Sequence, residues 1–313
     1  MVGSLRCING VVQGIWFCFS AHRLPFTAHF LIIMIIDFHT HIFPRLFRED
    51  RHRFFPGEPG FETLYRSPKS NLAGMDSLLK TMNEEKIEKS VVVGFPWEKE
   101  DHFRRHNDYI IEAVHRHPDR LIGFCSFSPR YPLGWKEAER CLEAGLSGVG
   151  ELAFYHAPFE DGDIETMKEV MGVCEQFDVP VMLHTNEPVG HKYPGKTPIS
   201  LAQLYRLIET YPSNRMVLAH WGGGLFFYAL MKKEVKEVLN NVWLDTAATP
   251  YLYRPEVYKI AGKIVGFERI LFGSDYPLLK PGRYFEEMAS VKLSDQAIQK
   301  ISGENAAALL GLS

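Results

Sequence analysis

Eight short apolar segments alternate with amphipathic segments along most of this 313-residue chain. Each apolar segment is rich in Val, Ile, Leu or Phe and is bounded by Gly, Pro or polar residues, which is typical of buried β-strands. Nearly continuous apolar runs fit a parallel sheet that is covered on both faces. The predicted strands are Ile35–His39, Ser90–Phe95, Leu121–Phe127, Ser147–Ala153, Val179–Thr185, Met216–His220, Val242–Thr246 and Ile270–Ser274.

The segments between these strands have recognisable helix ends. Pro118 and Pro212 follow two of them, and Asp163 stands in a capping position before a third. The predicted helices are Met75–Glu85, Asn107–His117, Leu133–Ala144, Ile164–Phe177, Ile199–Thr210, Leu225–Leu239, Pro255–Val265 and Asp295–Leu310. Eight strand–helix repeats favour an α/β fold of the (β/α)8 TIM barrel type, as a single domain. Counting strands does not exclude an open doubly wound sheet, but no glycine-rich nucleotide fingerprint follows the first strand.

The first 33 residues precede this pattern. They contain an apolar run, Val11–Ser20, that is too short to span a membrane and is compatible with a secretory signal. We favour another interpretation, because Met34 begins the string MIIDFHTH, which reads as the natural start of a first barrel strand. We therefore predict an N-terminal extension over residues 1–33, dispensable or upstream of the true translation start, and a barrel domain over residues 34–313.

The net charge and the cysteine content indicate which binding partners and which cellular compartment to expect. The net charge of −3 and the pI of about 6.5 do not indicate a polyanion-binding surface, so nucleic acid is not an expected partner. The five cysteines are scattered without a CxxC pair, which suits a reducing compartment and argues against thiolate metal ligands. We expect a cytoplasmic protein that acts on a small molecule, has no membrane partner and can form a homo-oligomer.

Residues that can bind metals end five of the eight predicted strands. They are His39 and His41 on the first strand, then Glu151, His184, His220 and Asp275 on the fourth, fifth, sixth and eighth. In a barrel of this type the C-terminal strand ends form the active site. Residues two apart on a strand point to the same side, so His39 and His41 can both face the barrel axis.

This set of side chains is suited to metal chemistry. Imidazoles combined with carboxylate oxygens favour zinc or another borderline divalent ion, and we predict one or two ions, with zinc as the expected metal. A water on the metal would supply hydroxide near neutral pH, with Asp275 as both ligand and proton acceptor. Singly, each residue has a structural explanation: Asp275 could cap a turn, for example, and Glu151 could pair with a Lys or Arg. Separate structural roles do not explain why all six residues lie at strand ends.

Six strings in this chain resemble the amidohydrolase superfamily, and specifically the amidohydrolase-related branch that includes aminocarboxymuconate-semialdehyde decarboxylase. The strings span Met34–Leu312 and are MIIDFHTHIFP, VGELAFY, PVMLHTNEP, MVLAHWGGG, ILFGSDYP and ISGENAAALLGL. The resemblance implies a catalytic metal on His39, His41, His184 and Asp275. It implies that His220 activates or orients water or binds a second metal. Glu151 departs from the mononuclear decarboxylase pattern and is similar to the strand-four glutamate of TatD-like members, where a carboxylate bridges two metals.

From the motifs and the resemblance together, we expect a metal-dependent hydrolase that cleaves a C–N or C–O bond of a small molecule. The alternative is non-oxidative decarboxylation of a small carboxylic acid, because the same branch includes decarboxylases. Arg45, Arg48 and Arg51, in the irregular segment His41–Lys69, could then bind a substrate carboxylate or simply form a solvated loop surface. A non-catalytic binding barrel is a third hypothesis, which would require missing ligands, and none is missing.

Other motifs are assigned structural roles. Four histidines in a polar helical segment are expected to be solvated: His102, His106, His115 and His117. The run Gly222-Gly223-Gly224 could indicate a phosphate loop, but a tight turn beside His220 explains it better, because glycine relieves backbone crowding.

Overall fold

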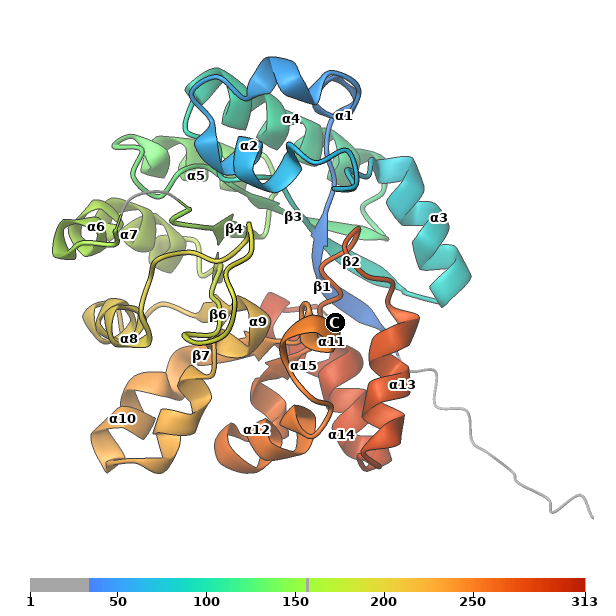
Figure 1. The fold of residues 1–313 in the computed structure, drawn as a ribbon, viewed down its shortest axis with the longest axis vertical. Coiled ribbons are helices and arrows are strands. Elements are labelled where there is room, and N and C mark those ends of the chain that lie inside the picture. Colours follow the sequence, from blue (N-terminus) through green and yellow to red (C-terminus); the bar gives the residue numbers. More distant parts are fainter. Residues whose placement is uncertain (1–33, 156–157, 313) are drawn as a thin grey trace, which may run out of the picture. The chain divides into compact units, whose positions relative to one another are not determined.

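A computed structural model describes residues 34–155 and 158–312, so the predicted extension over residues 1–33 lies outside the described residues. Eight parallel strands pair in chain order, each with the next, and helices surround them (Figure 1). The strands are β1 (Ile36–His41), β2 (Lys89–Val93), β3 (Leu121–Cys125), β4 (Gly148–Leu152), β5 (Val181–Leu183), β6 (Met216–Leu218), β7 (Val242–Asp245) and β8 (Ile270–Leu271).

Backbone contacts between the last strand and the first bring the two edges of the sheet together. The N–H of Phe38 donates to the carbonyl of Phe272, and the N–H of His41 donates to the carbonyl of Tyr276, both at 2.7 Å. Thr40 also forms a parallel bridge with Tyr276. The predicted (β/α)8 barrel is therefore confirmed.

Each predicted helix has an observed counterpart, but several are shorter or interrupted, the helix predicted from Asn107 begins at Glu100, and the helix Gly282–Ser290 was not predicted. The predicted helix Ile164–Phe177 is two helices, and Leu225–Leu239 is a 3-10 helix followed by a short α-helix. The segment His41–Lys69, predicted to be irregular, folds into three short helices. The helices are α1 (Arg45–Glu49), η1 (Arg51–Phe54), α2 (Pro59–Tyr65), α3 (Met75–Glu85), α4 (Glu100–Arg116), α5 (Gly134–Glu143), α6 (Asp161–Thr166), α7 (Lys168–Gln176), α8 (Leu201–Thr210), α9 (Ala219–Gly222), η2 (Leu225–Leu230), α10 (Lys233–Val238), η3 (Leu239–Asn241), α11 (Thr249–Leu252), α12 (Val257–Val265), η4 (Phe267–Arg269), α13 (Gly282–Ser290), α14 (Asp295–Gln299), η5 (Lys300–Glu304) and α15 (Asn305–Leu310).

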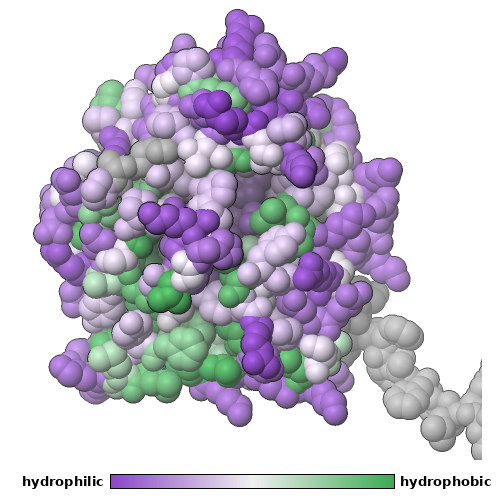
Figure 2. Space-filling view, in the orientation of Figure 1, coloured by the Kyte–Doolittle hydropathy of each residue, from purple (hydrophilic) through white to green (hydrophobic). Residues whose placement is uncertain are grey.

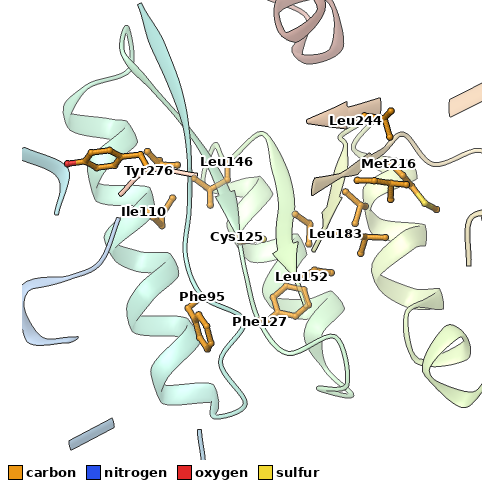
Figure 3. Close-up of a cluster of buried hydrophobic side chains, with 14 of the residues drawn as sticks. Phe95, Ile110, Cys125, Phe127, Leu146, Leu152, Leu183, Met216, Leu244 and Tyr276 are labelled. Atoms are coloured by element: carbon orange, nitrogen blue, oxygen red, sulfur yellow. The ribbon is translucent and has the colours of Figure 1, made fainter. Parts of the chain in front are cut away.

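The core lies between the strands and the surrounding helices. Figure 3 shows part of it, including Ile110 from α4, Cys125 from β3 and Leu152 from β4, all of which are buried. A second buried cluster joins Phe38 of β1 to Leu309 of the C-terminal helix α15. Burial on both sides holds the strands rigidly, and it is their C-terminal ends that carry the predicted site residues. Among the described residues, no helix has the length and apolar character needed to cross a membrane.

Candidate metal centre

Four of the six predicted site residues converge around one point. The Nε2 atoms of His39 and His41 lie 3.1 Å apart. The Oδ1 atom of Asp275 lies 3.5 Å from the Nε2 of His41 and 3.8 Å from that of His39. The Oε2 atom of Glu151 lies 3.8 Å from both imidazole nitrogens. Two residues of β1 therefore meet carboxylates from β4 and from the segment after β8.

Glu151 also connects this group to the two remaining predicted residues. Its Oε1 atom lies 2.9 Å from the Nδ1 of His184 and 3.7 Å from the Nε2 of His220. Two groups of three residues with metal-binding atoms thus share Glu151: one with His39 and His41, the other with His184 and His220. The barrel brings together all six residues that the strand-end pattern selected.

Hydrogen bonds outside the cluster fix which ring nitrogen of each histidine faces inward. His41 Nδ1 lies 3.2 Å from the carbonyl of Gly94, and His220 Nδ1 lies 3.1 Å from the carbonyl of Ala247. A carbonyl only accepts, so these Nδ1 atoms carry hydrogen and the Nε2 atoms face the cluster. His184 is reversed, because its Nε2 donates to the carbonyl of Gly195 at 2.8 Å and its Nδ1 faces Glu151.

Asp245, at the end of β7, belongs to the site but was missed in the sequence-based prediction. It is fully buried, and its Oδ2 lies 2.7 Å from the Nδ1 of His39. The signal was present, because the predicted seventh strand Val242–Thr246 contains this aspartate near its C-terminal end. The prediction of site residues had left this strand out.

The charges in the cluster are strongly coupled. Burial alone lowers the pKa of His39, but the carboxylates of Asp245 and Glu151 outweigh it and raise the pKa to about 10. Burial likewise lowers the pKa of His220, yet hydrogen bonding to Glu151 and the charge of Asp275 raise it to about 9. Burial raises the pKa of Glu151, but His184 and His39 bring it well below its usual value. The carboxylates therefore make this buried site attractive to positive charge.

The turn after β6 has the tight form that its glycines predicted. His220 and Trp221 have left-handed φ angles of 56° and 61°, and three glycines with positive φ follow. A Cβ on Gly223 would lie 2.2 Å from the carbonyl oxygen of Asn186, so only glycine fits at this close approach to the segment after β5. The turn places His220 in the cluster.

An aromatic wall borders the cluster. Tyr155, which follows β4, stacks on Phe95 with ring centroids 5.7 Å apart and lies 5.4 Å from the ring of His184. Tyr65 at the end of α2 packs against Phe95 at 6.0 Å. Within the described part of the chain, the hydroxyls of Tyr65 and Tyr155 have no hydrogen-bond partner. Burial, followed by the nearby carboxylates of Glu151 and Asp275, raises the pKa of both phenols, so they stay protonated donors. Figure 2 shows that this side of the molecule is hollowed near its centre.

The three arginines considered for substrate binding are engaged elsewhere. Arg45 is largely exposed and pairs with Glu49. Arg48 donates to the carbonyl of Phe43, and Arg51 donates to the backbone carbonyls of Tyr65, Ser67 and Ser70. Arg45 therefore fits the alternative interpretation, a solvated loop surface. Arg51 instead stabilises the fold of its own loop through hydrogen bonds to the backbone.

Two histidines that were expected to be solvated are not. His106 is fully buried, accepts from the indole N–H of Trp97 at 2.9 Å and donates to the carbonyl of Ile42 at 2.7 Å. His102 is mostly buried and lies 2.8 Å from Glu58. The prediction was wrong because the segment after β1 folds over α4 and covers this face of the helix.

Comparison with known proteins identifies the family. The amidohydrolase family model matches residues 36–312. Gamma-resorcylate decarboxylase from Rhodococcus jostii is 25% identical over 291 residues, covering 76% of this chain and 87% of that protein.

Two solved structures share the fold. The 5-carboxyvanillate decarboxylase from Sphingomonas paucimobilis superposes with a TM-score of 0.73 at 15% identity, covering 90% of this chain and all of that one. A dihydroxybenzoic acid decarboxylase from Polaromonas, with bound manganese and the inhibitor 2-nitroresorcinol, gives 0.66 at 20% identity, covering 89% and 97%.

These comparisons correct the expected activity. Hydrolysis of a C–N or C–O bond was the leading expectation, but the relatives are named as decarboxylases, which agrees with the alternative. The hydrolase expectation was wrong because the strand-end ligands are common to both kinds of reaction and do not distinguish them. Since the family model covers nearly all of the described barrel, this chain belongs to the amidohydrolase family.

Proposed function

We propose that this protein is a metal-dependent decarboxylase of a hydroxylated aromatic carboxylic acid. The observation that carries the proposal is an aromatic wall beside the cluster of imidazoles and carboxylates, with two phenols, Tyr65 and Tyr155, whose hydroxyls have no partner among the described residues. The relatives named for gamma-resorcylate, 5-carboxyvanillate and dihydroxybenzoic acid support the same substrate class.

The donor set fits a divalent cation. Two ligands bonded at about 2.1 Å to one tetrahedral ion lie roughly 3.4 Å apart. The inward-facing nitrogens of His39 and His41 lie 3.1 Å from each other and 3.5–3.8 Å from the facing oxygens of Asp275 and Glu151. We propose that these residues hold the ion, with His184 and His220 beside Glu151 able to complete the site or hold a second ion. When bound, the ion would supply positive charge that fixes the substrate carboxylate and stabilises charge developing on the ring.

The metal identity was predicted as zinc, and the mixed nitrogen–oxygen donor set also suits manganese. Manganese is the ion in the Polaromonas neighbour. Reconstitution of chelated protein with Zn²⁺ or Mn²⁺, followed by activity and metal analysis, decides between them. If Glu151 bridges two ions, Glu151→Gln should lower the metal content from about two per chain to about one. Unchanged stoichiometry in that variant would assign Glu151 a different role.

The aromatic wall would orient the substrate ring. Tyr155 stacks on the buried Phe95 with the two rings parallel to within 2°, which holds the Tyr155 ring in place beside His184. Offset stacking against such a ring is favourable for another aromatic ring. The Tyr65 and Tyr155 hydroxyls can donate to ring oxygens of the substrate, which selects hydroxylated acids over unsubstituted ones because only the former supply an acceptor.

Decarboxylation requires the protein to provide one proton. The bond between the ring carbon and the carboxyl carbon breaks, carbon dioxide leaves, and the ring carbon keeps the electron pair and takes a proton. We propose that His220 and Asp275, the two predicted catalytic residues, handle this proton. His220 Nδ1 is committed to the carbonyl of Ala247, so Nε2 is the atom that can gain and release a proton toward the cluster. General acid catalysis of this kind contributes roughly 10²–10⁴-fold.

A substrate panel tests the proposal. Metal-replete protein should release carbon dioxide from one or more hydroxylated benzoic acids, and chelated protein should not. Asp275→Asn and His220→Asn should each lower kcat by roughly 10²-fold or more. Turnover that is fully retained after metal removal, or a panel in which no aromatic acid is decarboxylated, would contradict the proposal.

A further inference from the structure

Asp245 contacts two histidines of the cluster from a single buried carboxylate. Its Oδ2 accepts from the Nδ1 of His39 at 2.7 Å. Its Oδ1 accepts from the backbone N–H of His220 at 2.8 Å and from that of Ala247 at 3.0 Å. The residue is fully buried, and both oxygens are used. We propose that Asp245 is a positioning residue that sets the metal affinity of the site through His39 and holds His220 in place.

The contact with His39 determines which nitrogen of that ring can bind a metal. A carboxylate only accepts, so the hydrogen of the imidazole is held on Nδ1. The lone pair then stays on Nε2, which faces His41, Glu151 and Asp275. Carboxylates that accept from a metal-binding histidine fix its orientation and make it a stronger ligand.

The contact with His220 supports an unfavourable backbone conformation. His220 and Trp221 are non-glycine residues with positive φ, an unfavourable conformation that persists only where neighbouring contacts hold it. Asp245 accepts the N–H of His220, and Thr249 accepts from the indole of Trp221 at 2.8 Å. The segment from the end of β7 into α11 thus restrains the turn after β6. Within it, Asp245 also contacts His39 of β1.

The substitution Asp245→Asn separates these two roles. The amide oxygen of the new side chain can still accept from the N–H groups of His220 and Ala247, so the turn is kept. The amide NH₂ group then faces His39 Nδ1 and can only donate. The ring hydrogen of His39 moves to Nε2, where it points into the cluster and blocks the lone pair. Asp37 provides a matched control: it is buried on β1 and accepts from the backbone N–H and hydroxyl of Ser274 and from the backbone N–H of His39, but it forms no hydrogen bond to an imidazole ring within the described chain.

The test is the dissociation constant for Mn²⁺, measured without substrate by competition with a chelator, together with the thermal midpoint of each protein. We expect Asp245→Asn to bind Mn²⁺ roughly 10–100-fold more weakly than wild type, with a thermal midpoint close to that of wild type. Asp37→Asn should keep wild-type affinity to within about threefold. Asp245→Ala should lose both affinity and thermal stability, because the turn after β6 is released as well.

Wild-type affinity in Asp245→Asn would overturn this inference, and so would an equal loss of affinity in Asp37→Asn. The inference rests on the proposed metal centre but not on the reaction. Weakened binding in Asp245→Asn together with a panel of inert aromatic acids would support the role of Asp245 and refute decarboxylation alone. Wild-type protein that binds no Mn²⁺ would overturn both.

Discussion

Gly273→Ala should damage the candidate metal centre although it adds only one methyl group. Gly273 lies between β8 and Asp275, and a Cβ at this position would be 2.7 Å from the Cβ of His39 and 3.5 Å from that of Asp245. Ordinary contact begins at 3.4 Å, so restoring it requires a backbone shift of 0.7 Å, the difference between 3.4 and 2.7. Both neighbouring atoms are next to rigid strand backbone and cannot swing aside.

The expected magnitude follows from that shift. Overpacking of a buried site costs roughly 1–3 kcal/mol, or roughly 2–5 °C in the thermal midpoint of a barrel of this size. Misplacement of a site residue by about 1 Å can cost roughly 10²-fold in rate, so kcat/KM should fall by a similar factor, and the metal content should fall with it. The measurements are thermal unfolding, metal analysis and turnover on the best substrate of the panel.

Gly172 in α7 supplies the matched control. A Cβ there meets nothing within 4 Å, so Gly172→Ala should be neutral or stabilising by roughly 0.5–1 kcal/mol through helix propensity, with unchanged turnover. A Gly273→Ala protein with wild-type stability, metal content and turnover would refute the reasoning. It would mean that the contact between β1 and the end of β8 relaxes without disturbing His39.

Three further predictions concern other parts of the chain. Tyr155→Phe should lower kcat/KM for a hydroxylated acid by up to about 10-fold. The thermal midpoint should stay unchanged, because the Tyr155 hydroxyl has no partner in the described protein. An equal loss of kcat/KM on an unsubstituted acid would contradict the donor role. Burial lowers the pKa of His106 to about 3, below the 6.5 of an unfolded histidine. Unfolding between these pH values therefore takes up a proton, and the free energy of unfolding should rise as the pH rises from about 3 to 6.5. Denaturant titrations of His106→Gln should show a smaller rise over the same range. A chain that begins at Met34 should fold and bind metal as the full chain does, and insolubility of that shorter chain alone would show that residues 1–33 are needed.

The barrel and the convergence of six candidate site residues at its rim could be predicted from the sequence, because both depend on local patterns. Apolar segments at regular spacing specify parallel strands, and the C-terminal ends of such strands must meet. His39 and Asp275 are far apart in the chain, yet each ends a strand and so both lie at the same rim. The same logic would have found Asp245, which ends β7.

Features that depend on loop packing could not be predicted in this way. Tyr65 reaches the site only because the segment after β1 folds into short helices, and nothing in its periodicity indicates where α2 will lie. The same segment buries His106, which looks polar on an amphipathic helix. The strand-end pattern also could not predict the type of reaction, because His39, His41 and Asp275 could hold a metal for hydrolysis or for decarboxylation.

The most direct test of the proposed activity is a single turnover measurement in D₂O with 2,6-dihydroxybenzoate labelled with ¹³C in its carboxyl group. The account predicts that Mn²⁺-loaded protein releases ¹³CO₂ and leaves resorcinol with one deuterium at the carbon that carried the carboxyl group. Chelated protein should produce neither. Metal-loaded protein that binds this acid or others of its class but releases no labelled carbon dioxide would contradict the account.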